Sequence, residues 1–334
     1  MSTKENAMAR GTLKATIHSM HRRSQWHDYS SPRIYMLTLV TMNRQRLFGT
    51  LTGDPHLPLY TPGAASVKLS ELGLAILRDE VPKISHYYPM VEVWKVCVMP
   101  DHLHIIVTVK EQMPAGKHLG IVIKGFKQGC NKAFWHIFNL TSIHPALFEP
   151  NYCDKILSDP GQLDRWKRYL DDNPRRLMLK TMNPAFFSVR HHLSINGRQC
   201  AAIGNLFLLD IPDKMEVVVH RRDSDDEYKD KMKVWMQCGE NYGVLVGAFI
   251  SPREREVKQM AIENGYFLIQ LTNEGIGSYY KPRGMDIDAC ADGRMLILSP
   301  WPEAALEKNG ITRQECLQLN ALATQMAQGQ FELG

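Results

Sequence analysis

Two histidines, His102 and His104, begin an apolar segment of the chain. Residues 102–109 have the composition of a core strand, and side chains two apart on a strand point to the same face. The pair can therefore present two imidazoles to one metal ion, because neutral imidazole is a common metal ligand. Taken alone, a strand that begins with His-x-His is more often no metal site at all.

A tyrosine and an asparagine, Tyr169 and Asn173, lie four residues apart in a segment with helical spacing of its apolar residues. Positions i and i+4 are neighbours on one helix face, so a phenol and an amide oxygen lie close together. An asparagine before Pro174 is also an ordinary helix stop, and Tyr169 could be core packing beside Trp166 and Leu170. This pair alone is weak evidence of a site.

Together, the four side chains indicate chemistry on a phosphodiester. Two imidazoles and one amide oxygen leave positions open on a divalent ion, which can bind phosphate oxygens as a Lewis acid. Zinc suits imidazole, whereas a mixed nitrogen and oxygen site facing phosphate suits Mn²⁺ or Mg²⁺ equally well. A tyrosine hydroxyl directed at phosphorus would displace the 3′ oxygen and leave a covalent 5′-phosphotyrosine. Such strand cleavage involves no hydrolysis.

The elements that must position these side chains predict an α+β sandwich, one antiparallel sheet with helices on a face. β-branched and aromatic residues mark the strands, and the second and third strands form a hairpin whose turn lies just before His102. Apolar residues at helical spacing mark the helices, and the last of them ends at Asn173, because proline disfavours helix in the residue before it. The strands are residues 34–41, 91–98 and 102–109. The helices are residue 69 to Pro82 or a little beyond it, residues 117–138 and residues 160–173.

The second half of the chain has a different pattern. Short strands joined by turns at residues 196–197 and 204–205 come first, followed by a charged helix over residues 221–233. Strands then alternate with helices, and this order implies a parallel sheet. The strands are residues 243–249, 266–271 and 295–299, and the helices are residues 252–264, 287–292 and 312–327.

Ser251 begins one of these helices as the N-cap, with Pro252 at the first helical position and Glu254 completing a capping box. Free amides at a helix start can receive a phosphate, which makes Ser251 a candidate ligand residue. A well-capped helix without any ligand explains the same residues, because no glycine-rich phosphate-binding pattern is present.

Charge separates the two halves of the 334-residue chain, whose length suggests two domains. Residues 1–180 carry 24 Lys and Arg against 15 Asp and Glu, a net charge of +9, whereas the rest carries 16 against 20, a net charge of −4. The basic half is the natural partner of nucleic acid, since phosphates are bound first by charge. The candidate contacts with the DNA backbone, each of which could equally be an ordinary solvated side chain, are Lys124, Lys127, Lys132, Arg165, Arg168, Arg175 and Arg176.

The seven cysteines include no C-x-x-C pair and fit neither a disulfide framework nor a cysteine zinc site. They favour a reducing compartment. No apolar run approaches the roughly 20 residues that a membrane span needs, and the first residues lack the apolar core of a signal peptide. We therefore expect a cytoplasmic protein without a membrane segment.

Two motifs carry a resemblance to a known family. Residues 99–106, Met-Pro-Asp-His-Leu-His-Ile-Ile, resemble the histidine-hydrophobe-histidine (HUH) signature of the single-tyrosine transposases. Residues 166–175 resemble the tyrosine-x-x-x-asparagine-proline helix of the branch associated with repetitive extragenic palindromes, and residues 43–48 match a further feature of these enzymes. The resemblance covers roughly residues 33–182. It implies that His102, His104 and Asn173 hold a metal ion, Mg²⁺ or Mn²⁺, and that Tyr169 is the nucleophile.

For the fold, the resemblance implies a ferredoxin-like (RRM-like) HUH domain, an antiparallel sheet with helices on one face, over residues 31–184. Residues 1–30 are then a flexible basic arm, and residues 185–334 a β-hairpin region plus a smaller Rossmann-like α/β domain. This last part faintly resembles DNA processing protein A and the nucleotide phosphoribohydrolases. A nucleotide, a DNA end and a partner protein all remain open as its ligand.

For the function, the resemblance implies metal-dependent nicking and strand transfer on single-stranded or hairpin DNA, by a monomer or a homodimer. Two other functions remain compatible with the sequence. One is a non-catalytic regulator that binds DNA hairpins and keeps the transposase fold. The other is a zinc hydrolase that acts on a small molecule through His102 and His104, with Tyr169 taking no part.

Overall fold

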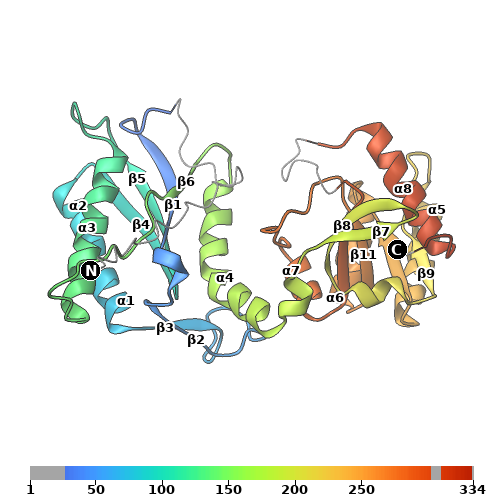
Figure 1. The fold of residues 1–334 in the computed structure, drawn as a ribbon. Helices are drawn as coiled ribbons and strands as arrows, with labels where there is room; N and C mark the ends of the chain where they lie inside the picture. Colours follow the sequence, from blue (N-terminus) through green and yellow to red (C-terminus); the bar gives the residue numbers. More distant parts are fainter. Residues whose placement is uncertain (1–26, 302–309, 333–334) are drawn as a thin grey trace, which may run out of the picture. The chain divides into compact units, whose positions relative to one another are not determined.

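The computed structural model describes residues 27–301 and 310–332. Most of the expected basic arm, residues 1–26, lies outside the described residues, and Tyr29 is buried in a hydrophobic core. Contacts divide the chain into two compact units, the first ending at Arg175 and the second beginning at Arg176. Figure 1 shows the elements of each unit, which are described separately.

The first unit contains a four-stranded antiparallel sheet in the order β4-β5-β1-β6. The predicted hairpin is confirmed by the pairing of β4 (Val91–Met99) with β5 (His102–Val109), and β5 also pairs with β1 (Arg33–Val40). The α+β class is therefore confirmed. Three strands of four residues each, too short to show a two-residue period, escaped prediction: β2 (Gly49–Thr52), β3 (Ser66–Leu69) and β6 (Cys153–Ile156).

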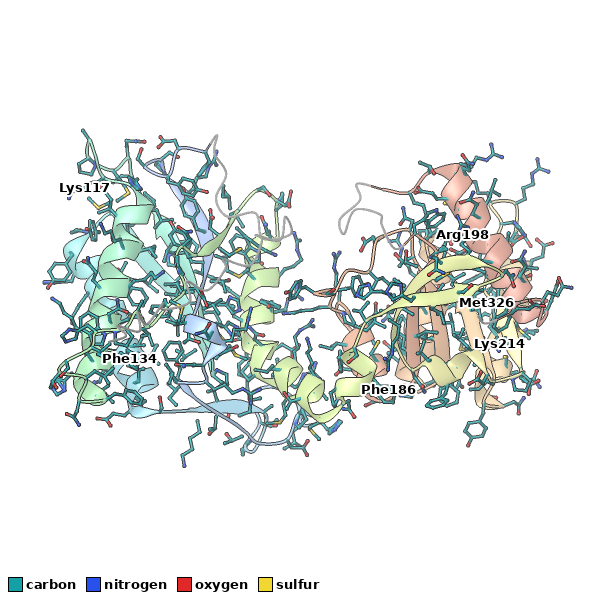
Figure 2. All side chains as sticks on the ribbon, viewed as in Figure 1. Lys117, Phe134, Phe186, Arg198, Lys214 and Met326 are labelled. Carbon is teal, nitrogen blue, oxygen red and sulfur yellow. The ribbon has the colours of Figure 1, made fainter. Side chains whose placement is uncertain are left out.

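The core of the first unit lies on one face of this sheet. Leu103, Ile105 and Val107 of β5 are fully buried and pack with α3 (Leu119–Ile137). Burial of each such side chain stabilises the fold by about 1.5–3 kcal/mol. Their partners from α3 are Leu119, Val122, Ile123, Phe126 and Phe134. Phe134 is labelled in Figure 2.

The helix expected to begin at residue 69 and to run to Pro82 or a little beyond it is present and contains an irregular turn. It consists of α1 (Glu71–Ala75), a π-helical turn (Ile76–Glu80) and α2 (Val81–Tyr87). Pro82 lies in the first turn of α2, where its missing N–H is not needed, so the helix continues past it.

Helix α4 (Gln162–Met182) lies on the other face of the sheet, as Figure 1 shows. The ring of Tyr169 contacts the ring of His104, and His104 alternates along β5 with the core residues Leu103 and Ile105. The expectation of helices on one face only was therefore wrong for α4. Its buried Trp166 packs on the second face of the sheet, which we expected to be exposed to solvent.

The expected end of this helix at Asn173 was also wrong, since α4 contains Pro174 and continues to Met182. A proline inside a helix removes one backbone hydrogen bond and disfavours helix in the residue before it. Leu179, beyond the proline, is buried in the core of the second unit, and such packing outweighs local preference. Within residues 27–301 and 310–332, no helix has the length and apolar character to cross a membrane.

The second unit contains a six-stranded sheet in the order β7-β8-β12-β11-β10-β9. The predicted parallel sheet is confirmed for four neighbouring strands, while β8 is antiparallel to β12 and β7 to β8. The strands are β7 (Arg190–Ile195), β8 (Arg198–Gly204), β9 (Lys214–Glu216), β10 (Val244–Gly247), β11 (Phe267–Leu271) and β12 (Met295–Ser299).

Helices cover both faces of this second sheet. α5 (Asp225–Glu240) and α6 (Pro252–Glu263) contribute Trp235 and Val257 to the core on one face, to which α7 (Asp286–Ala291) also belongs. α8 (Arg313–Ala327) contributes Leu319 and Met326 to the core on the other face. The turn predicted at Asn196 joins β7 to β8 with a φ of 51°.

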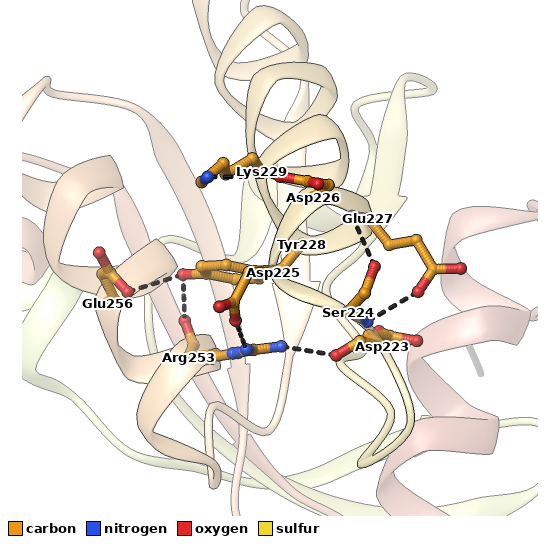
Figure 3. A network of polar contacts seen from close by, with 9 residues as sticks. All are labelled: Asp223, Ser224, Asp225, Asp226, Glu227, Tyr228, Lys229, Arg253 and Glu256. Carbon is orange, nitrogen blue, oxygen red and sulfur yellow. Dashed lines mark hydrogen bonds and ion pairs between the residues drawn. The ribbon is translucent and has the colours of Figure 1, made fainter.

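A polar network joins the start of α5 to the start of α6 (Figure 3). The Arg253 guanidinium donates to the backbone oxygen of Asp223 at 2.9 Å and to the carboxylate of Asp225. The Tyr228 hydroxyl donates to the backbone oxygen of Arg253 at 3.1 Å and to Glu256 at 2.9 Å. α5 begins at Asp225, later than the predicted residue 221, because Ser224 caps the helix and forms a capping box with Glu227.

Gly73 of α1 allows a close approach that supports the turn before His102. A Cβ added at Gly73 would lie 2.2 Å from the backbone oxygen of Phe48, whose N–H donates to the Pro100 oxygen at 3.0 Å. We expect Gly73→Ala to lower the midpoint of urea unfolding, although alanine is favoured over glycine in helices by about 1 kcal/mol. The reason is that Phe48 is hydrogen-bonded to Pro100, so it cannot move away from the added methyl group without displacing the turn that precedes His102.

Gly125→Ala is the matched control, because Gly125 is exposed in α3 and a Cβ there meets nothing within 4 Å. This variant should raise the midpoint. A Gly73→Ala midpoint at or above that of the wild type would contradict the close approach.

Candidate active site

His102 and His104 lie at the start of the central strand β5 and face the side of the sheet that α4 covers. Their ring centroids are 4.8 Å apart and the ring planes are nearly perpendicular, at 84°. His104 is buried, with 6% of its surface exposed. The predicted pair thus forms one compact group on a rigid core strand.

Each histidine directs Nδ1 to a protein oxygen. The Asp101 carboxylate accepts from His102 Nδ1 at 2.6 Å, and Thr38 Oγ1 lies 2.9 Å from His104 Nδ1. Thr38 reaches His104 because the two residues are paired across β1 and β5. Partners of this kind fix the orientation of the ring, so a metal ion would be coordinated through Nε2.

Asp101 is itself held by its neighbours. Its backbone oxygen accepts from Thr41 N at 3.0 Å and from Thr41 Oγ1 at 2.9 Å, and its carboxylate lies 3.3 Å from Arg44. Burial alone would raise the pKa of Asp101, but the hydrogen bond and charge of His102, together with Arg44, hold this pKa below its usual value. The carboxylate is therefore ionised over the whole physiological range.

Helix α4 brings Tyr169 to the histidines. The ring centroids of Tyr169 and His104 are 5.7 Å apart, at an interplanar angle of 69°. One turn further along, Asn173 is buried, and its Nδ2 has no hydrogen-bond partner in the part of the chain that the structure describes. Trp166, one turn before Tyr169 on the same helix, is buried. The structure thus brings together His102, His104 and Tyr169.

The candidate DNA contacts on α3 lie on the opposite face of the sheet from these residues. Lys124 and Lys132 are exposed there. The Lys127 ammonium donates to the backbone oxygens of Glu149 at 2.6 Å and Asn151 at 2.9 Å, and burial lowers its pKa. Lys127 therefore has a structural role in fixing the loop before β6.

The candidate contacts on α4 differ among themselves. Arg165 and Arg168 are exposed on the helix that carries Tyr169. Arg175 donates to the Asp172 carboxylate at 2.5 Å, whereas Arg176 belongs to the second unit and donates to the Pro282 oxygen at 2.9 Å. Arg165 and Arg168 are thus the predicted cations with the greatest access to solvent on this helix.

In the second unit, the amides of Ile250, Ser251 and Glu254 around the start of α6 already have protein partners. Ser251 Oγ accepts from Glu254 N at 3.2 Å, and the buried Glu254 carboxylate accepts from the N–H groups of Val219, Ile250 and Ser251. A phosphate at Ser251 would compete with this carboxylate.

Two residues that support the histidines, Asp101 and Thr38, were missed by sequence reasoning. Asp101 could have been found, because an acidic residue directly before a histidine ligand is a plausible partner for its ring. Thr38 could not, since only the strand pairing brings it opposite His104. Within residues 27–301 and 310–332, no group of three or more His, Cys, Asp or Glu side chains is arranged to hold a metal ion.

Comparison with known proteins gives only weak likenesses. No protein-family profile matches the chain. An uncharacterized protein of Haemophilus influenzae is 23% identical over 197 residues, which cover 52% of this chain and 94% of that protein. A REP-associated tyrosine transposase solved bound to a REP hairpin is similar with a TM-score of 0.30 and 17% identity, over 46% of this chain and 73% of that one.

DNA processing protein A from Helicobacter pylori is similar with a TM-score of 0.29 and 18% identity, over 38% of this chain and 56% of that one. Likenesses at these scores do not show to which family the chain belongs. Its function must be argued from its own residues.

The lowered pKa of Asp101 predicts a pH-dependent contribution to stability. The folded state favours the carboxylate, so its contribution is complete above the usual carboxyl pKa, about 3.9, and is lost as the pH falls through the lower folded value. We expect Asp101→Asn to lower the free energy of unfolding by about 1–2 kcal/mol at pH 6. In urea titrations the difference from the wild type should shrink towards pH 3.

Asp164→Asn, which removes an exposed carboxylate from α4, controls for the loss of charge and should have little effect. If the difference in the free energy of unfolding between Asp101→Asn and the wild type grows as the pH falls, the carboxylate does not stabilise the fold.

Proposed function

We propose that this protein is a metal-dependent enzyme that nicks and rejoins single-stranded or hairpin DNA, with Tyr169 as the nucleophile. The observation that carries the proposal is the contact between Tyr169 and His104, whose ring centroids are 5.7 Å apart. Tyr169 lies on α4 and the histidine pair on β5, so the fold brings together residues that are far apart in the sequence. Packing alone would not require two imidazoles with oriented Nδ1 partners on this face.

The topology supports the finer assignment of the two units. An antiparallel four-stranded sheet supports a ferredoxin-like HUH domain for the expected residues 31–184. Four parallel strands covered by helices on both faces support a smaller Rossmann-like domain within residues 185–334. Contacts divide the chain after Arg175, within α4, whereas the expected boundary follows residue 184.

His102, His104 and Asn173 would hold Mg²⁺ or Mn²⁺, which supplies Lewis-acid polarisation of the phosphate when it is bound. Asp101 and Thr38 hold Nδ1 of the two imidazoles, so Nε2 would be the nitrogen that binds the ion. A half turn of the Asn173 amide would bring its oxygen to the place of Nδ2. A cation would then supply the partner that this buried position lacks among residues 27–301 and 310–332. The donor set therefore fits a divalent ion.

In the reaction, the Tyr169 oxygen forms a bond to phosphorus while the bond from phosphorus to the 3′ oxygen breaks. The phenolic proton leaves to solvent and the 3′ oxygen takes up a proton, so no water enters the products. A 5′-phosphotyrosine and a free 3′ hydroxyl result. Because one phosphodiester replaces another, the same step run backwards rejoins a strand.

Tyr169→Phe tests the nucleophile directly. Incubated with pools of single-stranded and hairpin oligonucleotides and Mn²⁺ or Mg²⁺, the wild type should form a covalent adduct that survives denaturing electrophoresis. Tyr169→Phe should form none and keep its DNA affinity, because only the attacking oxygen is lost. Tyr87→Phe, at an exposed tyrosine of α2, is the control and should react like the wild type.

If the wild type binds hairpins but forms no adduct, the protein is the non-catalytic regulator. If a zinc-dependent hydrolysis of small molecules persists in Tyr169→Phe, the histidines serve a hydrolase instead.

Asn173→Leu separates metal binding from folding. The buried Nδ2 has no hydrogen-bond partner among the described residues, which corresponds to a desolvation cost of about 1–3 kcal/mol. An apolar side chain of similar size should therefore raise the stability of the metal-free protein. The same change removes an oxygen ligand and should raise the Mn²⁺ concentration needed for half-maximal adduct formation at least tenfold. Urea unfolding without metal and adduct assays against Mn²⁺ measure the two effects. A variant that is stabilised and fully active would remove Asn173 from the ligand set.

A further inference from the structure

A β-bulge in β4 decides which side chains of that strand lie on the face of the histidines. The pairing with β5 is regular up to Val93, skips Trp94, and resumes with Lys95 opposite Ile106. One extra residue turns every later side chain to the other face of the sheet. Lys95 therefore shares a face with Ile106, and so with His104, two residues away on β5.

From this position, Lys95 forms an ion pair with Asp171 of helix α4. Its Nζ lies 2.5 Å from Asp171 Oδ1, and only 28% of the Lys95 side chain and 20% of the Asp171 side chain are exposed. Asp171 lies on α4 between Tyr169 and Asn173. The ion pair thus joins the sheet to the turn of helix that carries the candidate nucleophile, and its partial burial limits screening by salt.

Tyr60 reaches the same carboxylate from the loop between β2 and β3. A hydrogen bond to Asp171 raises the pKa of the Tyr60 hydroxyl. Tyr60 has a φ of 68°, a left-handed conformation that residues with a side chain rarely adopt. Asp171 therefore interacts with two separate parts of the first unit, strand β4 and the loop between β2 and β3.

We propose that Lys95 and Asp171 are a positioning pair, which fixes the rotation of α4 so that Tyr169 faces the histidines; this inference rests on the proposed function. The buried Trp166 and Leu170 hold the helix against the sheet, but apolar packing has little directionality and permits small rotations. An ion pair from a bulged position specifies one rotation. A misplacement of about 1 Å at a reacting atom can cost about a hundredfold in rate.

Lys95→Met and Asp171→Asn test the pair in the full chain. At saturating oligonucleotide and Mn²⁺, each should slow single-turnover adduct formation by about ten- to a hundredfold. DNA affinity, measured in the Tyr169→Phe background, should stay within about twofold, because the pair acts on the helix and not on the substrate. The exchanged pair, Lys95→Asp with Asp171→Lys, should recover most of the rate.

Lys110→Met and Asp164→Asn remove exposed charges from the first unit and serve as matched controls that leave the rate unchanged. A loss of DNA affinity in Lys95→Met that parallels its loss of rate would overturn the proposal, since Lys95 would then be a DNA contact. Wild-type rates in both single variants would overturn it as well.

Hydrogen–deuterium exchange without DNA keeps the test independent of the nuclease activity. Lys95→Met should speed amide exchange in residues 166–173 of α4 at least severalfold, and the exchanged pair should restore slow exchange. If exchange responds in this way but no DNA yields an adduct, the proposed function fails and the positioning pair stands. If exchange is unchanged in Lys95→Met, the positioning pair is wrong even where the wild type cleaves DNA.

Discussion

The alternation of side chains along β5 is the constraint on which the rest of the first unit depends. Leu103 and Ile105 are fully buried in the core, so the strand cannot rotate or slip by one residue without exposing them. His102 and His104 are thereby forced onto the opposite face. Burial of these apolar side chains fixes the register of the strand, and the register in turn fixes the direction of the two imidazoles. A site built in this way is rigid, because its geometry belongs to a central strand and not to a loop.

The face of the sheet opposite the core is unusual for a protein interior, because it buries polar side chains. His104 and Asn173 are buried polar side chains there, and the Asn173 amide nitrogen lacks a partner within the described residues. Such groups cost stability unless they are hydrogen-bonded, and natural proteins keep them mainly where function requires them. Asp101 and Thr38 supply the oxygens that orient the histidines, and α4 supplies the phenol. Packing and chemistry are thus divided between the two faces of one sheet.

The second unit satisfies its polar groups more completely. The Glu254 carboxylate caps the start of α6, and Arg253 ties α6 to the segment before α5 (Figure 3). A helix start that has its own carboxylate binds a phosphate only by displacing it. Any ligand of this unit must therefore be sought in groups that the fold does not already use, which leaves Ser251 a weaker candidate than its sequence context suggested.

Periodicity in the sequence determined most strands and helices and the shared face of His102 and His104, because these depend on residues a few positions apart. The candidate role of Tyr169 came from the resemblance of its motif to that of the single-tyrosine transposases. Tertiary structure alone decided what depends on pairing between distant segments. Strand register brought Thr38 to His104, the bulge at Trp94 turned Lys95 towards α4, and burial of Leu179 carried α4 through its proline. A local pattern records which side of an element is apolar. Which distant residue meets that element is settled only when the whole chain is packed.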